Sequence, residues 1–353
     1  MRVDLARRPA MIVTLCLISG ATCGYWWRGR TTPGELPSLR GVVARCQPAV
    51  VGVRCLLHPE HRASVREGSG FFIHPDGLIA TNAHLVAGRM LVVVEVQGRG
   101  RFTAEVVGED ELSDVAVLRI RGAGRPFPAL AFGDSDEVAA GDWVVSIGRP
   151  LSLGHTVTAG LVSSAQRHLP IDDANITARS LQFSAAVNPG CSGSPVLDLA
   201  GRVVGMTIGK AHAGEGLAFA VPSKVLQWVL DRMERHDGKV PRGYLGVSLA
   251  PGSAEGGGAR VTRVEPGGPA WRAGVRDGDI LVRFAGEPVV DAESLYDRIM
   301  QTLPATEVAV EVCAPPRAGP RALVAVLGAV PVPEAAGERD PAPDRPERAG
   351  AMH

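Results

Sequence analysis

A serine set between glycines, in the segment Asn188-Pro189-Gly190-Cys191-Ser192-Gly193-Ser194-Pro195, constrains this chain more than any other feature. Proline and glycine predict a tight turn, in which backbone N–H groups can converge on one point beside the serine hydroxyl. Such a pair of N–H groups binds the negative oxygen that forms when a serine attacks a carbonyl carbon. Turns rich in glycine and serine are common, so this turn predicts a nucleophile only if partner side chains occur elsewhere.

Two upstream segments carry those partners. His84 follows an apolar, strand-like run, and Asp114 precedes the apolar run 115–118. A serine hydroxyl becomes nucleophilic when an imidazole accepts its proton, and a carboxylate fixes the tautomer of that imidazole. We therefore predict Ser192 as nucleophile, His84 as general base and then acid, and Asp114 as the orienting carboxylate. The order His, Asp, Ser along the chain is that of chymotrypsin.

The backbone amides of Gly190 and Ser192 are the predicted oxyanion-hole donors, because the flanking glycines allow positive φ angles and a close backbone approach. The alternative interpretation of Ser192 is a structural serine in a turn. Three motifs in this order, each at the end of an expected strand, favour the catalytic interpretation.

The segment from Gly68 to Val86 resembles the histidine segment of HtrA-type serine proteases. The segments 133–136 and 156–163 and the serine segment match the same family in the same order, and the resemblance covers about residues 40–328. It implies a mainly β fold, with a chymotrypsin-like double β-barrel protease domain followed by a PDZ domain. The expected organisation is an N-terminal anchor or signal with its linker (1–39), the protease domain (40–234), the PDZ domain (243–328) and a disordered tail (329–353).

Short apolar runs separated by turns predict the strands of the two barrels. The runs lie at residues 50–53, 71–80, 90–96 and 115–120 in the first block and at 143–147, 181–186, 203–208 and 217–221 in the second. A helix is expected after them, with Ser223 as its N-cap. The polar stretch 234–242 is expected to be a linker.

Three positions depart from the pattern of the family, which usually has Asn, Gly and Asp where this chain has Cys191, Ser194 and Ser184. Cys191 and Ser194 flank the pair formed by Ser192 and Gly193. They are therefore expected to alter the oxyanion loop, which is the turn at residues 188–195 that carries the predicted oxyanion donors. Cys191 has two interpretations, as a small, inert, buried residue or as an exposed thiolate open to oxidation. If these changes abolish turnover, the protein is a non-proteolytic chaperone or scaffold that binds peptides.

The run Tyr244, Leu245, Gly246 and Val247 resembles the carboxylate-binding loop of an HtrA-type PDZ domain, and the segment 267–281 strengthens this resemblance. In such a module the loop amides hold the terminal carboxylate of a peptide, which adds as a strand to an exposed sheet edge. A helix at 291–300 would line the groove. The alternative for the loop is an ordinary edge strand.

The resemblance also places the substrate pocket. Its floor is expected at Ala186 and its wall at Met206, Thr207 and Ile208, none of which is charged. A pocket without a carboxylate cannot compensate a buried cation, so we expect small or medium aliphatic side chains before the cleaved bond.

Regulation and assembly are further implications of the resemblance. Arg167 lies where the family has a loop arginine that relays activation, and its alternative is a solvated surface cation. The short connection from Leu57 to Glu67 and the single PDZ domain favour a homotrimer over larger cages.

Residues 10–27 form an 18-residue run without charge, which is long enough to span a bilayer. Tyr25, Trp26 and Trp27 at its end are typical of an interfacial aromatic belt and favour a retained transmembrane helix. The alternative is a signal cleaved near the small residues 19–21.

Composition excludes other classes of function. Lys and Arg together number 37, as do Asp and Glu, so no net charge steers the protein to nucleic acid. The six cysteines show neither a disulfide framework nor metal-ligand spacing, and a disulfide between Cys46 and Cys55 is not expected. No Walker-type loop is present, and no cofactor or metal is predicted.

These observations predict a membrane-anchored, ATP-independent serine endopeptidase of protein quality control and stress response. Its expected partners are misfolded or regulatory proteins and, at the PDZ domain, peptides with free C-termini that regulate cleavage. The protease domain is expected to face the periplasm. Secretion to the periplasm and the mitochondrial intermembrane space are the alternatives.

Overall fold

The structure is a computed structural model that describes residues 38–57, 65–121, 126–149, 154–171, 176–210, 216–314 and 319–331. The chain divides into two compact units. The first comprises the described residues up to Leu169 together with those from Ala178 to Asp231, and the second comprises the described residues from Pro170 to Thr177 together with those from Arg232 onwards.

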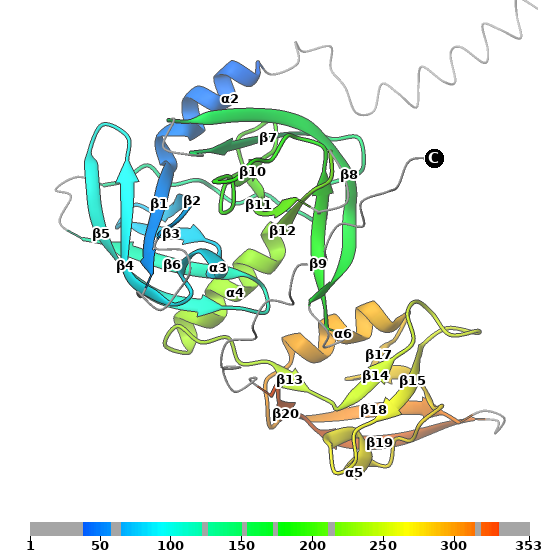
Figure 1. Cartoon of the computed structure of the whole chain (residues 1–353). Helices are drawn as coiled ribbons and strands as arrows, with labels where there is room; N and C mark the ends of the chain where they lie inside the picture. The colour runs from blue at the N-terminus through cyan, green and yellow to red at the C-terminus, as the bar shows by residue number, and fades with distance from the viewer. Residues whose placement is uncertain are drawn as a thin grey trace, which may run out of the picture. The chain divides into compact units, whose positions relative to one another are not determined.

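The first barrel of the first unit is closed, with the strand order β1-β2-β3-β6-β5-β4 and antiparallel pairing (Figure 1). Its strands are β1 (Val50–Leu57), β2 (Val65–His74), β3 (Leu78–Thr81), β4 (Arg89–Val96), β5 (Gly100–Asp110) and β6 (Val115–Ile120). Alternate residues of each strand face the interior, where Ile79 and Leu118 are fully buried. The ring of Phe72 stacks on that of Phe127, with 4.3 Å between centroids.

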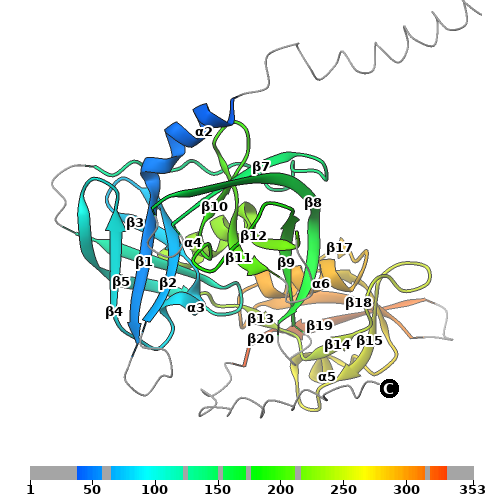
Figure 2. The same ribbon diagram turned by 45° about the horizontal axis from the view of Figure 1, so that its top comes forward.

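The second barrel is also closed, in the order β10-β11-β12-β9-β8-β7. Its strands are β7 (Trp143–Gly148), β8 (Thr156–Ile171), β9 (Ile176–Phe183), β10 (Pro195–Leu197), β11 (Val203–Lys210) and β12 (Ala218–Pro222). In both views β8 is a long curved strand along one side of this barrel (Figures 1 and 2). Leu181, Phe183 and Val196 are fully buried in its core. The double barrel predicted from the sequence is therefore present.

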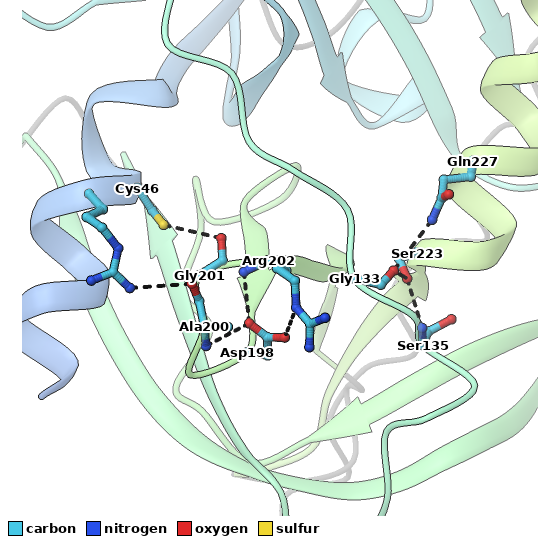
Figure 3. A network of polar contacts seen from close by, with 10 residues as sticks. Cys46, Gly133, Ser135, Asp198, Ala200, Gly201, Arg202, Ser223 and Gln227 are labelled. Carbon is cyan, nitrogen blue, oxygen red and sulfur yellow. Dashed lines mark hydrogen bonds and ion pairs between the residues drawn. The ribbon is translucent and has the colours of Figure 1, made fainter. Parts of the chain in front are cut away.

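Helix α2 (Leu39–Cys46) and the 3-10 turn η2 (Gln47–Ala49) lead into β1. The Cys46 thiol donates a hydrogen bond to the carbonyl of Gly201, in the turn between β10 and β11 (Figure 3). Burial raises the pKa of this thiol above its ordinary value. The start of the first barrel is thus attached to the second barrel.

Helix α4 (Ser223–Arg235) begins as expected, but the predicted role of Ser223 as N-cap is wrong. Its buried hydroxyl donates to the carbonyl of Gly133 at 2.8 Å and accepts from the amide of Ser135 at 3.0 Å (Figure 3). The amide of Lys224 donates instead to the hydroxyl of Ser135, at 3.2 Å. The helix starts at Ser223 itself, so a side chain from another segment supplies this cap.

Several boundaries differ from the sequence predictions. The run 71–80 is two strands, because the turn at Gly77, with φ of +91°, separates β2 from β3. Strand β5 was not predicted, since charged and polar residues interrupt its apolar residues and leave no continuous apolar run. Strand β9 ends at Phe183 rather than at Ala186, and α4 continues into the expected linker as far as Arg235.

The second unit contains one sheet with the order β14-β15-β16-β18-β19, in which β17 pairs with β16. Its strands are β14 (Val247–Leu249), β15 (Ala259–Val264), β16 (Ile280–Phe284), β17 (Glu287–Pro288), β18 (Glu307–Cys313) and β19 (Pro320–Val326). Strands β13 (Gly243–Tyr244) and β20 (Gly328–Ala329) form a separate pair. The described structure continues to residue 331, and the amide of Val330 donates to the carbonyl of Arg242, so the tail does not begin at residue 329 as predicted.

Two helices complete the second unit, α5 (Pro269–Ala273) and α6 (Ala292–Gln301). Asp291 and Ser294 form a capping box that begins α6, because each side chain bonds the backbone N–H of the other. Leu295 and Ile299 of α6 pack into the core of this unit.

Within the described residues, no helix is long and apolar enough to cross a membrane. The predicted anchor at 10–27 lies outside these residues, as does the tail from residue 332. Cys46, Cys55, Cys191 and Cys313 are free thiols.

Candidate active site

The pairing of β3 with β6 brings His84 and Asp114 together. Thr81 of β3 is the register partner of Ala116 of β6, and the two candidate residues lie just beyond these positions, His84 in α3 (Ala83–Val86). The ring atom Nδ1 of His84 lies 2.8 Å from Oδ2 and 3.0 Å from Oδ1 of Asp114. A carboxylate at Nδ1 favours the tautomer that carries its proton there, which leaves Nε2 free to accept one.

Backbone contacts hold this pair in place. The amide of His84 donates to Oδ1 of Asp114 at 2.9 Å, and the side-chain amide of Asn82 donates to the carbonyl of Asp114 at 3.1 Å. Asp114 has a φ of +54°, which is unfavourable for a residue with a side chain. One guanidinium nitrogen of Arg66 donates to the carbonyls of His84 and Ala87, each at 2.9 Å. The side chain of His84 remains 46% exposed, so it is accessible to a substrate.

The candidate nucleophile lies in the loop between β9 and β10. The hydroxyl of Ser192 donates to the carbonyl of Ile208 on β11 at 3.0 Å. Gly193 follows with a φ of +83°, and a Cβ atom there would lie 2.0 Å from the carbonyl oxygen of Ser69. Only glycine fits this position.

Hydrogen bonds to its carbonyl groups hold the oxyanion loop in place. The hydroxyl of Ser69 donates to the carbonyl of Gly190, and the amide of Ser69 donates to the carbonyl of Ser192, each at 2.8 Å. The amide of Cys191 donates to the carbonyl of Asn188 at 2.9 Å. In the described part of the chain, the amides of Gly190 and Ser192 donate to no protein group. These are the two amides that the sequence predicted as oxyanion donors.

The three departures from the family pattern have different surroundings. Cys191 is only 5% exposed, which favours its interpretation as an inert buried residue. The fully buried hydroxyl of Ser194 has no hydrogen-bond partner among the described residues, and a Cβ atom at Gly148 would lie 2.4 Å from it. Ser184 is exposed, and its hydroxyl accepts from the amide of Leu161 at 2.9 Å.

The expected pocket residues do not share one environment. Ala186 is exposed and Ile208 is half-buried, whereas Met206 and Thr207 are fully buried and closed to solvent. Arg167, the regulatory candidate, is exposed and donates from Nε to the side chain of Gln182 at 3.0 Å.

The predicted peptide-binding loop of the second unit connects β13 to β14. Gly246 has a φ of +76°, and its carbonyl accepts from the amide of Glu265 at 2.9 Å. Strand β14, which begins at Val247, is an edge strand of its sheet. The hydroxyl of Tyr244 donates to the carboxylate of Glu265 at 2.6 Å, and the carbonyl of Leu245 accepts from the amide of Ala270 at 2.8 Å. Burial, followed by this carboxylate, raises the pKa of Tyr244 to about 12.

Sequence reasoning missed the residues that hold the site, chiefly Ser69 and Arg66 on β2. Ser69 lies between Gly68 and Gly70, in a segment already matched to the family. A small polar residue between two glycines was the available signal, because it permits close contact with another backbone.

Two family models match the chain. One, described as a trypsin-like peptidase domain, matches residues 68–206, and the other, described as a PDZ domain, matches residues 260–313.

Curated relatives include the probable periplasmic serine endoproteases, described as DegP-like, of Brucella suis and Halomonas elongata. The first is 37% identical over 269 residues, and the second is 37% identical over 267 residues. Each alignment covers 72% of this chain, and it covers 51% of the Brucella protein and 55% of the Halomonas protein. The chain therefore spans about half the length of the curated relatives it matches.

Solved structures are similar over most of the chain. The HtrA-type protease AlgW with a tripeptide has a TM-score of 0.73 and 28% identity, covering 85% of this chain and 99% of that one. A serine endoprotease from Yersinia pestis has a TM-score of 0.66 and 28% identity, covering 85% of this chain and 100% of that one. These comparisons confirm the predicted fold of two barrels followed by a PDZ domain.

Proposed function

Because this chain belongs to the HtrA-type serine proteases, with a trypsin-like peptidase domain and a PDZ domain, we propose that it is a serine endopeptidase. The observation that carries this proposal is the contact between Nδ1 of His84 and the carboxylate of Asp114, in the same unit as Ser192. An imidazole fixed in this way is prepared to accept a proton at Nε2.

Catalysis begins when the hydroxyl of Ser192 turns from the carbonyl of Ile208 to Nε2 of His84. Its oxygen forms a bond to the carbonyl carbon of the substrate while its proton passes to His84. The amides of Gly190 and Ser192 stabilise the resulting oxyanion, and Asp114 stabilises the imidazolium. His84 then gives the proton to the leaving amine. A water molecule hydrolyses the acyl-enzyme by the same steps.

The proposed substrates are misfolded or regulatory proteins cleaved after small or medium aliphatic residues. The uncharged character of Ala186 and Ile208, the accessible members of the expected pocket, supports this preference. Cleavage is proposed to be independent of ATP. The names of the curated relatives support a location in the periplasm. Residues 10–27 are the proposed membrane anchor, and secretion to the periplasm is the alternative.

The PDZ domain is proposed to bind peptides that end in a free carboxylate. The loop from Tyr244 to Val247 would hold the carboxylate, and the peptide would pair with the edge strand β14. The tripeptide in the AlgW structure supports peptide binding in this family. Binding would shift the protease domain toward an active population, with Arg167 as a relay and a homotrimer as the assembly.

The test is cleavage of casein by the full chain, beside Ser192→Ala. Cleavage that disappears in the variant supports the endopeptidase. If both proteins cleave negligibly while both bind peptides with free C-termini, the non-proteolytic scaffold is the better account. The buried hydroxyl of Ser194, unpartnered among the described residues and close to the nucleophile, is the observation that keeps this second candidate open.

A further inference from the structure

Ser69, on β2 of the first barrel, is fully buried and bonds to two segments of the second barrel. Its hydroxyl donates to the carbonyl of Gly190 and accepts from the amide of Arg149, each at 2.8 Å. Its own amide donates to the carbonyl of Ser192, also at 2.8 Å. One residue therefore holds carbonyl groups on both sides of Cys191.

The direction of the hydroxyl proton of Ser69 is fixed by its second contact. A hydroxyl has one proton to donate, and the amide of Arg149 occupies an acceptor site on the same oxygen. The proton is therefore available for the carbonyl of Gly190. A fourth bond, from the hydroxyl of Thr81 to the carbonyl of Ser69 at 2.7 Å, keeps the backbone of β2 in place.

Arg149 is held in turn by its side chain, which is only 11% exposed. Its guanidinium lies 2.6 Å from the carboxylate of Glu95 on β4. A Cβ atom added at Gly52 on β1 would lie 3.6 Å from the stem of Arg149. A charge-assisted contact of this length is stronger than a neutral hydrogen bond. The amide that Arg149 presents to Ser69 is thereby attached to the first barrel.

The peptide group that Ser69 restrains is the one between Gly190 and Cys191, through its carbonyl. Gly190 has a φ of +91°, and glycine has few barriers to reorientation of the following carbonyl. If that carbonyl turned toward the attacked carbon, its negative end would face the developing oxyanion and destabilise it. The carbonyl of Gly190 shares its peptide group with the amide of Cys191, which donates to the carbonyl of Asn188. Ser69 therefore restrains the peptide group that lies between the two predicted oxyanion donors, the amides of Gly190 and Ser192.

We propose that Ser69 is a positioning residue. By holding the carbonyl of Gly190, it restrains the oxyanion loop in the arrangement in which the amides of Gly190 and Ser192 can bind the oxyanion. The kinetic consequence rests on the proposed endopeptidase function, whereas the restraint on the loop does not. A purely structural role for Ser69 would lower stability without a selective effect on turnover.

Ser223 provides a matched control for the loss of a buried hydroxyl. It is also fully buried, donates to a carbonyl at 2.8 Å and accepts from an amide at 3.0 Å (Figure 3). The residues it joins, Gly133 and Ser135, lie outside the oxyanion loop. Ser69→Ala and Ser223→Ala therefore remove equivalent contacts from different places.

The experiment measures kcat, KM and thermal unfolding for the full chain and both variants, together with hydrogen exchange in residues 186–196. Both variants are expected to unfold at lower temperature. Only Ser69→Ala is expected to lower kcat, roughly tenfold to a hundredfold with little change in KM, less than the about 10²–10³-fold cost of losing an oxyanion donor. Only Ser69→Ala is expected to accelerate exchange in the loop.

Unchanged loop exchange in Ser69→Ala, or equal acceleration in Ser223→Ala, would overturn the proposal. If the wild-type chain does not cleave, the proposed function fails and the exchange comparison alone decides the positioning role. If Ser69→Ala does not fold, Glu95→Gln is measured in its place. This change weakens the ion pair that holds Arg149 but leaves every buried side chain of the site present. A smaller acceleration of loop exchange is then expected, and none would contradict the proposal.

Discussion

The hydroxyl of Ser192 donates to the carbonyl of Ile208 at 3.0 Å, so its single proton is used in that bond and is not shared with the ring of His84. Attack requires rotation of this side chain, and any ligand that favours the rotated form should accelerate reaction at Ser192. We expect a peptide with a free C-terminus to increase the rate of fluorophosphonate labelling several-fold at saturation. The same peptide with an amidated C-terminus is the control. Equal rates with both peptides would contradict activation through the PDZ domain.

Asp114→Asn should nearly abolish turnover while leaving the fold intact. The carboxylate accepts from both the amide and the ring of His84, whereas an amide side chain supplies only one accepting atom. The ring would then tend toward the tautomer with its proton on Nε2, which cannot accept a proton from Ser192. We expect kcat to fall about 10⁴-fold, as this change does in related triads. Steady-state kinetics and circular dichroism check this, and a fall of less than tenfold would exclude Asp114 as the orienting residue.

Gly193→Ala should impair both stability and turnover. The added Cβ would lie 2.0 Å from the carbonyl oxygen of Ser69, in addition to the cost of a φ of +83°. Gly141 has a φ of +98°, but no atom of the described residues lies within 4 Å of the position that a Cβ would occupy there. Gly141→Ala therefore isolates the conformational cost, which is about 1–2 kcal/mol. Urea unfolding should show a larger loss for Gly193→Ala, and equal losses would mean that the loop relaxes away from Ser69.

Ser194→Ala should leave stability unchanged or raise it by up to about 1 kcal/mol, because it removes a buried hydroxyl that has no partner in the described part of the chain. Turnover should be retained, since the Gly193 and Ser194 backbone contacts do not depend on that hydroxyl. Differential scanning calorimetry and casein cleavage provide the measurements. A marked loss of stability would show that the hydroxyl has a partner, such as a buried water molecule.

Short apolar runs such as 90–96 were sufficient to predict individual strands. The arrangement of these strands in two barrels was predicted from the resemblance to the HtrA family. The sequence was also sufficient to predict the contact between His84 and Asp114, because the chemistry of an activated serine requires those residue types. The burial of both Met206 and Thr207 could not be predicted from strand alternation, which places neighbouring side chains on opposite faces. The register of β11 shifts between Thr207 and Gly209.

The contacts of Ser69 with Gly190 and Arg149 could not be predicted from the sequence, because these residues are 121 and 80 positions away from it. Only the closure of both barrels determines which backbone groups meet there. The orientation of Ser192 toward Ile208 is a rotamer choice, for which no pattern of residue types provides a signal.

The stability of the protein should fall in mild acid because of His155. Its Nε2 lies 3.0 Å from the carbonyl of Val50 and its Nδ1 lies 3.3 Å from the side-chain amide of Gln47. A neutral ring satisfies both contacts, donating from Nε2 and accepting at Nδ1, whereas a protonated ring cannot accept. Burial, with a contribution from the charge of Arg149, lowers the pKa of His155 below its ordinary value of 6.5.

The unfolded chain therefore binds a proton at His155 at a higher pH than the folded protein does. The contribution of neutral His155 to the free energy of unfolding is fully present above pH 6.5. It is lost as the pH falls toward the lower pKa of the folded state. We expect the urea midpoint to decrease between about pH 7.5 and about pH 5, and His155→Gln to reduce that decrease, because glutamine does not titrate. The difference between the two proteins separates His155 from the other histidines. An identical pH dependence in both would show that protonation of His155 is not coupled to unfolding.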